Sequence, residues 1–365
     1  MADSRLFKPL QLGAITLKNR VAMAPLTRFR ADDEHVPLPY VKEYYGQRAS
    51  VPGTLLITEA TYIDFANGGY PNVPGIYNQA QIDAWKKVTD AVHAKGSYIY
   101  LQLWALGRVA NPEFAKAHNI PVKSSSPVAL NSDYAEPEAL TLDEIKETVQ
   151  RYATAAKNSI AAGFDGVEIH GANGYLIDQF IQDNVNQRTD QYGGSIENRN
   201  RFAVEVTKAV VDAVGADRTG IRLSPFSTFQ GMRMKDPVPQ FTDLVSKLDA
   251  FGLAYVHLVE SRISGNADVE SSDSLDSLFH AFHGPILAAG GFKPDSARRL
   301  VDEEYKERDV VVVFGRYFIA NPDLPYRLEK GIEFTKYDRD TFYNAKEERG
   351  YTDYSFSPEF VKAQA

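Results

Sequence analysis

Residues 286–316 read ILAAGGFKPDSARRLVDEEYKERDVVVVFGR, and the fold can be inferred outward from this stretch. Ile286–Ala289 and Val310–Phe314 are short apolar runs of the kind that form a strand buried on both faces. Between them, Lys293-Pro294-Asp295-Ser296 is typical of a helix start. Glycine follows each apolar run. The stretch therefore predicts strand, helix and strand, with a glycine-containing turn after each strand.

The same alternation extends through the rest of the chain. Helical patterns run over Gln79–Lys95, from a capping box at Thr141–Glu144, and over Ile196–Val214 before Gly215. Eight strands separated by mostly helical connections predict a parallel α/β sheet, and a closed (β/α)8 TIM barrel fits the count best. A doubly wound open sheet is the alternative. The six further strand candidates are Val21–Ala24, Leu55–Ile57, Tyr98–Leu103, Val167–Ile169, Ile221–Leu223 and Tyr255–Val259.

Two segments depart from this alternation. Leu6–Leu17 alternates apolar and polar residues around Gly13, which predicts an N-terminal hairpin that closes the bottom of the barrel. Trp104–Ala139 follows the third strand and carries four prolines, so we expect an irregular insertion that forms a lid over the active-site face. No linker-like composition divides the chain, and we expect one domain over residues 1–365.

Composition excludes several classes of function. The chain of 365 residues has 40 Lys and Arg against 48 Asp and Glu, a formal charge of −8 and no cysteine. The acidic balance argues against nucleic-acid binding, and the absence of cysteine excludes disulfides, thiolate metal sites and thioether-linked cofactors. Neither a leader peptide nor a run of about 18 apolar residues is visible. We therefore expect a cytoplasmic protein without a membrane segment.

The ends of the last two strands predict a phosphate site. Gly290 and Gly291 follow the seventh strand, and Gly315 and Arg316 follow the eighth. Glycine lets backbone N–H groups approach an anion, and barrels commonly bind phosphate after strands seven and eight. Arg316 would add positive charge. Glycines that serve only tight turns are the alternative reading.

The end of the fourth strand has the residues best suited to catalysis. His170 and Asn173 are two donors three residues apart, able to converge on one ligand oxygen and stabilise negative charge. Tyr175 offers a phenolic proton for a carbanion-like carbon. A structural histidine and a metal ligand are the other uses of His170. The sequence has seven His but neither HxH nor HExxH, so we expect no metal site.

These residues belong to longer motifs that resemble the old yellow enzyme family, whose members are FMN-dependent ene-reductases on a TIM barrel. The likeness covers nearly the whole chain and is closest to fungal members, including reductases of alkaloid pathways. The motifs are Ala24–Arg28, Gln102–Trp104, His170–Leu176, Asp178–Phe180, Asn186, Arg188, Tyr192–Arg199, Arg222–Pro225, Phe314–Arg316 and Lys336–Tyr343.

The resemblance implies a role for each matching residue. It implies that FMN is bound non-covalently and that its ring system is contacted by Pro25, Thr27 and Ala60. Gln102 would bind the pyrimidine edge of the ring, and Arg222 would face N1 and O2. The phosphate would be held by Gly290, Gly291, Gly315 and Arg316. For the substrate, the resemblance implies a carbonyl clamp of His170 and Asn173, a proton donor in Tyr175, and pocket walls at Trp104, Phe229 and Tyr343.

The implied activity is reduction of enones or enals by FMN, with NADPH as the reductant or NADH in its place, in a specialised-metabolite pathway. Tyr175 favours net reduction, because relatives with Phe there act as isomerases. Thr27 excludes the branch that has Cys at this position. Asn173 replaces the His of some relatives and still donates. We expect small-molecule partners and a monomer or homodimer. The competing readings are a flavin-free sugar-phosphate isomerase or aldolase and a silent FMN-binding protein.

Overall fold

The computed structural model describes residues 3–264, 267–268, 271 and 273–364. Its centre is a closed barrel of eight parallel strands, in which every strand coincides with an apolar run expected to form one. The TIM-barrel prediction is confirmed, and the open-sheet alternative is wrong. In barrel order the strands are β3 (Val21–Met23), β4 (Leu55–Tyr62), β5 (Tyr98–Trp104), β8 (Gly166–His170), β9 (Thr219–Leu223), β10 (Tyr255–Val259), β13 (Ile286–Ala289) and β14 (Val310–Phe314).

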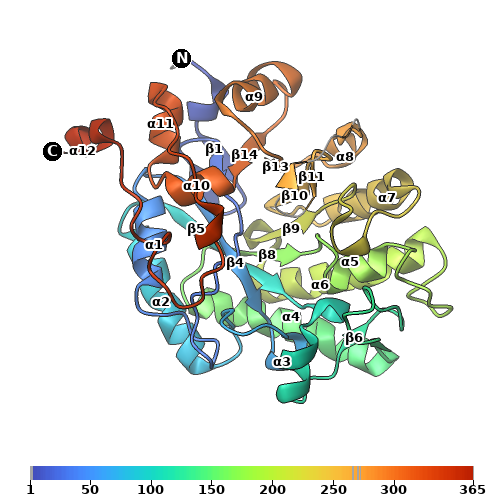
Figure 1. Ribbon diagram of the computed structural model, residues 1–365. Coiled ribbons are helices and arrows are strands. Elements are labelled where there is room, and N and C mark those ends of the chain that lie inside the picture. The colour runs from blue at the N-terminus through green and yellow to red at the C-terminus, as the bar shows by residue number, and fades with distance from the viewer. Residues whose placement is uncertain (1–2, 265–266, 269–270, 272, 365) are drawn as a thin grey trace.

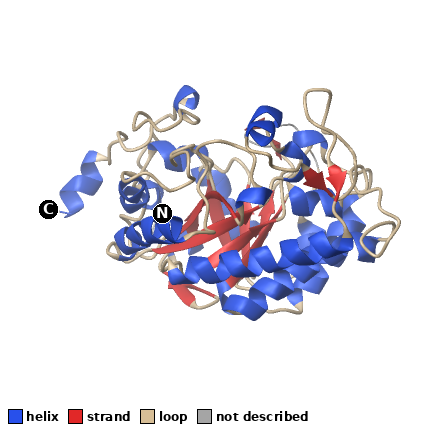
Figure 2. Cartoon of the chain, turned by 90° about the horizontal axis from the view of Figure 1, so that it is seen from below, coloured by secondary structure: helices blue, strands red, loops and turns tan. Residues whose placement is uncertain are grey.

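Helices surround the barrel, and the strands lie at the centre when the molecule is seen from below (Figure 2). Their apolar faces pack on the outer surface of the strands in one large core cluster. The helices are α1 (Val41–Arg48), α2 (Gln79–His93), α3 (Pro112–Ala117), α4 (Leu142–Ala161), α5 (Leu176–Ile181), α6 (Ile196–Val214), α7 (Pro237–Asp249), α8 (Asp276–Ala281), α9 (Pro294–Arg299), α10 (Arg316–Ala320), α11 (Leu324–Lys330) and α12 (Pro358–Gln364).

Local sequence signals fix where the long helices begin and end. The Thr141 hydroxyl accepts from the Glu144 N–H at 3.2 Å, and the Glu144 carboxylate accepts from the Thr141 N–H at 2.8 Å. This capping box starts α4 where the sequence predicts it. Gly215 ends α6 with φ of 98°, a value that favours glycine.

The N-terminal hairpin closes one end of the barrel, as expected. β1 (Leu10–Leu12) and β2 (Ile15–Leu17) pair antiparallel around Gly13. Their buried leucine and isoleucine side chains join the cluster formed by inward-facing barrel residues such as Tyr255 and Val311. The opposite end of the barrel, where the strands finish, is left for the functional site.

The segment between β5 and α4 is the irregular insertion that the prolines indicate. It contains α3 and two short strands, β6 (Lys123–Ser124) and β7 (Glu138–Ala139). The Arg108 guanidinium is buried and donates to the carbonyls of Val128 at 3.3 Å, Ala129 at 3.4 Å and Gln230 at 3.0 Å. The insertion is thereby tied to the loop that follows β9.

Two other features lie outside the simple strand–helix alternation. A short hairpin, β11 (Ile263–Ser264) and β12 (Ala267–Asp268), follows β10 before α8. Beyond α11 the chain returns across the barrel to α12, which projects from the body of the molecule (Figure 1). Within the described residues, no helix is long and apolar enough to cross a membrane.

Candidate active site

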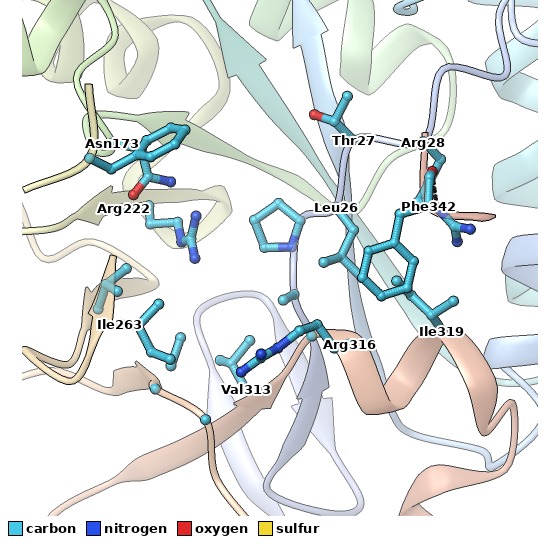
Figure 3. Close-up of a pocket in the computed structure, with 18 of the residues that line it drawn as sticks. Leu26, Thr27, Arg28, Asn173, Arg222, Ile263, Val313, Arg316, Ile319 and Phe342 are labelled. Atoms are coloured by element: carbon cyan, nitrogen blue, oxygen red, sulfur yellow. Dashed lines mark hydrogen bonds between the residues drawn. The ribbon is translucent and has the colours of Figure 1, made fainter. Parts of the chain in front are cut away.

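A cavity of about 1010 Å³ opens where the barrel strands end. Its walls come from the loop after β3, from the ends of β8, β9, β13 and β14, from the insertion, and from the segment after α11. In Figure 3, Asn173 and Arg222 lie on the left of the cavity and Thr27 lies at the upper right. Arg316 lies at the bottom of the view. A volume of this size accommodates a cofactor-sized ligand.

The turn after β8 brings Asn173 and Tyr175, from the His170–Tyr175 motif, to this cavity. Asn173 has φ of 58°, a conformation that asparagine tolerates better than most residues, and its N–H donates to the Ser224 hydroxyl at 2.7 Å. Gly174 has φ of 78°, and a Cβ there would lie 2.8 Å from Met232. The Gly174 N–H donates to the buried Asp178 carboxylate at 2.9 Å. The turn is therefore held by partners on both sides.

His170 is a neutral hydrogen-bond donor. The Ala172 N–H donates to its Nδ1 at 3.3 Å, so we assign the proton of the neutral ring to Nε2. Burial, together with the positive charge of Arg222, lowers the pKa of His170 well below its usual value. The side chain therefore offers an N–H without a positive charge at neutral pH.

Tyr175 lies against two aromatic neighbours. Its ring meets Trp104 edge-on with centroids 4.8 Å apart, and meets His170 edge-on at 4.9 Å. Burial raises the pKa of Tyr175 to about 12. The phenol is therefore protonated at neutral pH, and such a group can act as a general acid.

Arg222 supplies the positive charge in the middle of the cavity. Its strand pairs with β8 so that Arg222 and His170 are neighbours in register. Its Nε is buried and has no hydrogen-bond partner in the described part of the chain. Buried donors are nearly always paired, so this N–H suits an acceptor atom supplied by a ligand. The anionic flavin edge that the resemblance implies fits this donor.

The other end of the cavity holds Gly291 and Arg316. A Cβ on Gly291 would lie 3.0 Å from the Asp268 carboxylate and 3.9 Å from the Arg316 guanidinium. Arg316 donates to the two carboxylate oxygens of Asp268 at 2.8 and 3.2 Å. Asp268 thus occupies the position beside Arg316 where an anion would bind. A phosphate group fits the cation and the open glycine backbone.

The glycine at position 290 is explained by close packing, whereas the sequence suggested a role in phosphate binding. A Cβ on Gly290 would lie 2.3 Å from the side chain of Glu260, which packs against it from the neighbouring strand end. Gly290 still lines the cavity, as do Pro25, Thr27 and Gly315. Close packing alone therefore requires glycine at position 290.

The structure brings most of the expected site residues together, but three are buried in the barrel wall and are not part of the cavity lining. These are Ala60 on β4, Gln102 on β5 and His170 on β8. Gln102 is the register partner of both Ala60 and Glu168. The expected walls Trp104, Phe229 and Tyr343 do line the cavity, and Phe229 and Tyr343 are exposed at its mouth.

Several lining residues were not identified from the sequence. Tyr70 comes from the loop after β4, and Leu130 and Tyr134 come from the insertion. The insertion was expected to form a lid, but its proline-rich sequence has no periodicity from which to select the residues that point inward. Asp268 was missed because its partner Arg316 lies 48 residues away. Among the described residues, no group of three or more His, Asp or Glu could hold a metal ion.

The segment after α11 reaches the cavity because buried arginines hold it there. Arg28 donates from Nε to the Phe342 carbonyl at 3.0 Å, drawn as a dashed line in Figure 3, and from Nη2 to the Gly350 carbonyl at 2.7 Å. Its guanidinium also lies 5.4 Å from the centre of the Tyr44 ring. These contacts place Phe342 and Tyr343 beside the loop after β3.

The comparisons with a family model, with related proteins and with solved structures all agree on one family. The model of the NADH:flavin oxidoreductase / NADH oxidase family matches residues 5–335. Chanoclavine-I aldehyde reductase fgaOx3 of Penicillium roqueforti is 61% identical over 363 residues, covering 99% of this chain and 98% of that protein. A probable inactive reductase, easA of Epichloe festucae var. lolii, is 52% identical, with coverage of 99% and 97%. The crystal structure of Old Yellow Enzyme from Pichia sp. superposes with a TM-score of 0.91 at 40% identity, covering 98% of this chain and 95% of that one.

Proposed function

The chain belongs to the NADH:flavin oxidoreductase / NADH oxidase family, as an old yellow enzyme of the fungal type, and on this premise we propose that it reduces the C=C bond of α,β-unsaturated carbonyl compounds. It is an NAD(P)H-dependent oxidoreductase with FMN as its cofactor. Bound FMN supplies the hydride chemistry, between NAD(P)H and the acceptor. The protein's part is to orient the acceptor and to provide a proton.

The cavity supports a placement for the cofactor. Arg222 would face the pyrimidine end of the flavin, where its unpaired Nε needs an acceptor. The phosphate would lie at Gly291 and Arg316, in place of the Asp268 carboxylate. The remaining contacts would come from Pro25, Thr27, Ala60, Gln102, Gly290 and Gly315.

The observation that carries the proposed reaction is that the rings of His170 and Tyr175 contact each other and Trp104. Asn173 lines the same cavity as Tyr175 and Trp104. The N–H of neutral His170 and the amide of Asn173 would donate to the substrate's carbonyl oxygen and stabilise the negative charge that develops there. One such donor contributes about 3 kcal/mol. Tyr175, protonated at neutral pH, would then deliver its proton to the α-carbon.

Tyr175→Phe tests this assignment through the two half-reactions. We expect flavin reduction by NADPH to remain near the wild-type rate, because the phenol has no part in it. Reoxidation by cyclohexenone should slow by roughly 10²-fold, the usual contribution of a general acid. Stopped-flow absorbance measures both steps.

Tyr70→Phe is the matched control, since this second cavity phenol donates to the Val109 carbonyl at 2.9 Å. It should leave both half-reactions close to wild type. Equal reoxidation rates for Tyr175→Phe and wild type would remove Tyr175 from the mechanism. Failure of the wild-type protein to turn over any enone while binding FMN would instead favour a silent role, as the name of the Epichloe relative suggests for that protein.

The substrate class can be narrowed by the relatives. The Penicillium protein is named for an aldehyde, and we infer that the present enzyme acts on an unsaturated aldehyde or ketone of a fungal specialised-metabolite pathway. Chanoclavine-I aldehyde and simple enals and enones form the first assay panel. NADPH and NADH are compared in the same assay.

We further infer that the enzyme works in the cytoplasm, on small diffusible substrates, as a monomer or homodimer. Microscopy of a fluorescent fusion tests the location. Size-exclusion chromatography with light scattering tests the assembly, and a larger oligomer would contradict the inference.

A further inference from the structure

Beneath the cavity, inside the barrel, lies a carboxylate that the proposed reaction does not use. Glu168 is on β8, two residues before His170, so both side chains lie on the same face of the strand. Glu168 is fully buried, with no exposed surface. A buried carboxylate without partners would be costly, so its contacts are informative.

Three donors converge on Glu168 from two other strands. Gln102 Nε2 donates to Oε1 at 2.8 Å. Tyr255 donates its hydroxyl to Oε2 at 3.1 Å, and His257 Nδ1 lies 2.8 Å from the same oxygen. Gly220 leaves room for this arrangement, because a Cβ there would lie 2.4 Å from the Tyr255 ring. The carboxylate is therefore held in one position by the barrel.

The charges of this cluster can be assigned. Burial opposes ionisation of Glu168, but the hydrogen bonds donated by His257 and Gln102 and the charge of Arg222 together hold its pKa below the usual value. Burial lowers the pKa of His257, which is therefore neutral and donates through Nδ1. Its Nε2 is buried without a partner in the described residues. In this cluster the anion is therefore Glu168, beneath the cavity, and the cation that acts on it is Arg222, in the cavity lining.

Glu168 also decides which way the Gln102 amide faces. Because Nε2 donates to the carboxylate, the Gln102 oxygen and one N–H remain for another partner. The pyrimidine edge of a flavin presents an N–H between two carbonyl oxygens. An amide with a free oxygen and a free N–H is complementary to that edge, and a flipped amide would be less so.

We propose that Glu168 is a positioning residue for the flavin, which fixes the orientation of the Gln102 amide and balances the charge of Arg222, and so sets the reduction potential of the bound cofactor. This inference rests on the proposed placement of FMN against Gln102 and Arg222. Reduced flavin carries more negative charge than oxidised flavin. The anion behind Arg222 therefore keeps the potential lower than Arg222 alone would make it.

Glu168→Gln tests the proposal because it removes the charge and keeps the shape. The introduced amide can donate to His257 Nδ1 once the proton of that ring moves to the unpaired Nε2. We expect the midpoint potential of the bound FMN to rise by about 30 mV or more. For a two-electron couple this shift corresponds to a tenfold change in the ratio of affinities for reduced and oxidised FMN. Equilibration with reference dyes measures the potential.

Two variants separate this effect from a merely structural one. Glu168→Asp retains the charge and should restore most of the wild-type potential. Asp323→Asn removes a different buried carboxylate, which accepts from Arg327 at 2.8 Å outside the cavity lining, and should change stability without changing the potential. An unchanged potential in a folded, FMN-loaded Glu168→Gln protein would overturn the proposal.

Tyr255→Phe carries the test if Glu168→Gln does not fold. It removes one donor and no formal charge, so the carboxylate is less neutralised and the potential should move in the opposite direction, to lower values. A rise or no change would contradict the proposal. Gln102→Leu distinguishes the two levels of inference. If Gln102→Leu alters neither the FMN affinity nor the potential, the proposed cofactor placement is wrong. If Gln102→Leu alters them but Glu168→Gln leaves the potential unchanged, only the role of Glu168 is wrong.

Discussion

His170 acts as an uncharged donor because two features of its surroundings agree. The Ala172 N–H occupies Nδ1, and burial with Arg222 nearby disfavours the imidazolium. In the proposed reaction, a neutral ring leaves Arg222 as the cation that would face the flavin. The Nε2 proton of His170 would then be available to the substrate's carbonyl oxygen.

Asp178, which holds the turn after β8, should give stability a measurable pH dependence. Burial raises its pKa from 3.8 to about 7, although Gln182 and the Gly174 N–H donate to it. Because the folded protein holds the Asp178 proton more tightly than the unfolded chain does, protonated Asp178 contributes to the unfolding free energy. This contribution is fully present below about pH 4 and is lost as the pH rises through about 7. Asp178→Asn removes this dependence.

Between pH 5 and 8, we therefore expect the unfolding free energy of Asp178→Asn to rise relative to that of the wild type, by at most about 3 kcal/mol. Urea titrations at several pH values measure the difference. Glu59, whose pKa burial also raises to about 7, is present in both proteins and cancels. A difference that is constant with pH, or that moves in favour of the wild type, would contradict the assignment.

At the scale of elements, the insertion depends on Arg108 for its position. The guanidinium joins the carbonyls of Val128 and Ala129 to that of Gln230, so two loops that line the cavity share one anchor. Arg108→Met keeps the stem and leaves these carbonyls unpaired, at a cost of about 1–3 kcal/mol. We expect KM for the enone to rise several-fold, while flavin reduction by NADPH changes little. Steady-state and stopped-flow kinetics measure the two quantities.

Arg151→Met provides the comparison for Arg108. Arg151 lies on α4 and pairs with Glu147 at 2.6 Å, away from the cavity lining. Its loss should leave KM unchanged. A similar KM in both variants would show that the insertion is positioned without Arg108.

The β11–β12 hairpin brings an anion, Asp268, to the end of the cavity where we propose that the phosphate binds. The Asp268 side chain is 67% exposed, so its ion pair with Arg316 contributes at most about 1 kcal/mol. In the placement that we propose, the FMN phosphate would displace this carboxylate. We expect Asp268→Asn to bind FMN two- to fivefold more tightly, as about 1 kcal/mol allows, and Arg316→Ala to bind it more weakly. Flavin fluorescence titration of the apoprotein measures both affinities.

Asp273→Asn is the control for the hairpin, because Asp273 lies nearby in sequence and pairs with Arg233 at 2.6 Å instead. It should not change FMN affinity. Weaker binding by Asp268→Asn would mean that the carboxylate supports the cofactor rather than competing with it.

At the scale of the whole molecule, the barrel separates stability from chemistry by placing them at opposite ends. Leu12 on β1 is fully buried in the cluster at the hairpin end. Leu12→Ala should cost about 2–5 kcal/mol of unfolding free energy, the usual penalty for a buried leucine. The flavin spectrum and the half-reactions should remain as in the wild type, because the cavity lies at the other end.

Gln11→Ala is the matched control on the same strand, since the Gln11 side chain is exposed. It should change the unfolding free energy by less than about 0.5 kcal/mol. Denaturation in urea compares the two variants. A loss of flavin affinity in Leu12→Ala at temperatures where it is fully folded would show that the two ends are coupled.

The barrel strands, the three longest helices (α2, α4 and α6) and the motif residues could all be recognised from the sequence alone. Each apolar run, capping box and terminal glycine is a local signal, and a strand buried on both faces needs no knowledge of its partner to be recognised. Barrel strands also end at one face, so Asn173, Tyr175 and Arg316 could be placed at one cavity without coordinates.

Which side chains meet could be learned only from the folded chain. The three donors to Glu168 lie 66, 87 and 89 residues from it, and Asp268 lies 48 residues from Arg316. The same holds for Tyr70 and Tyr134, which enter the cavity from separate loops. Hydrogen bonds and ion pairs depend on distances of about 3 Å between atoms, and hydropathy or spacing along the chain does not encode such distances once the chain closes into a barrel.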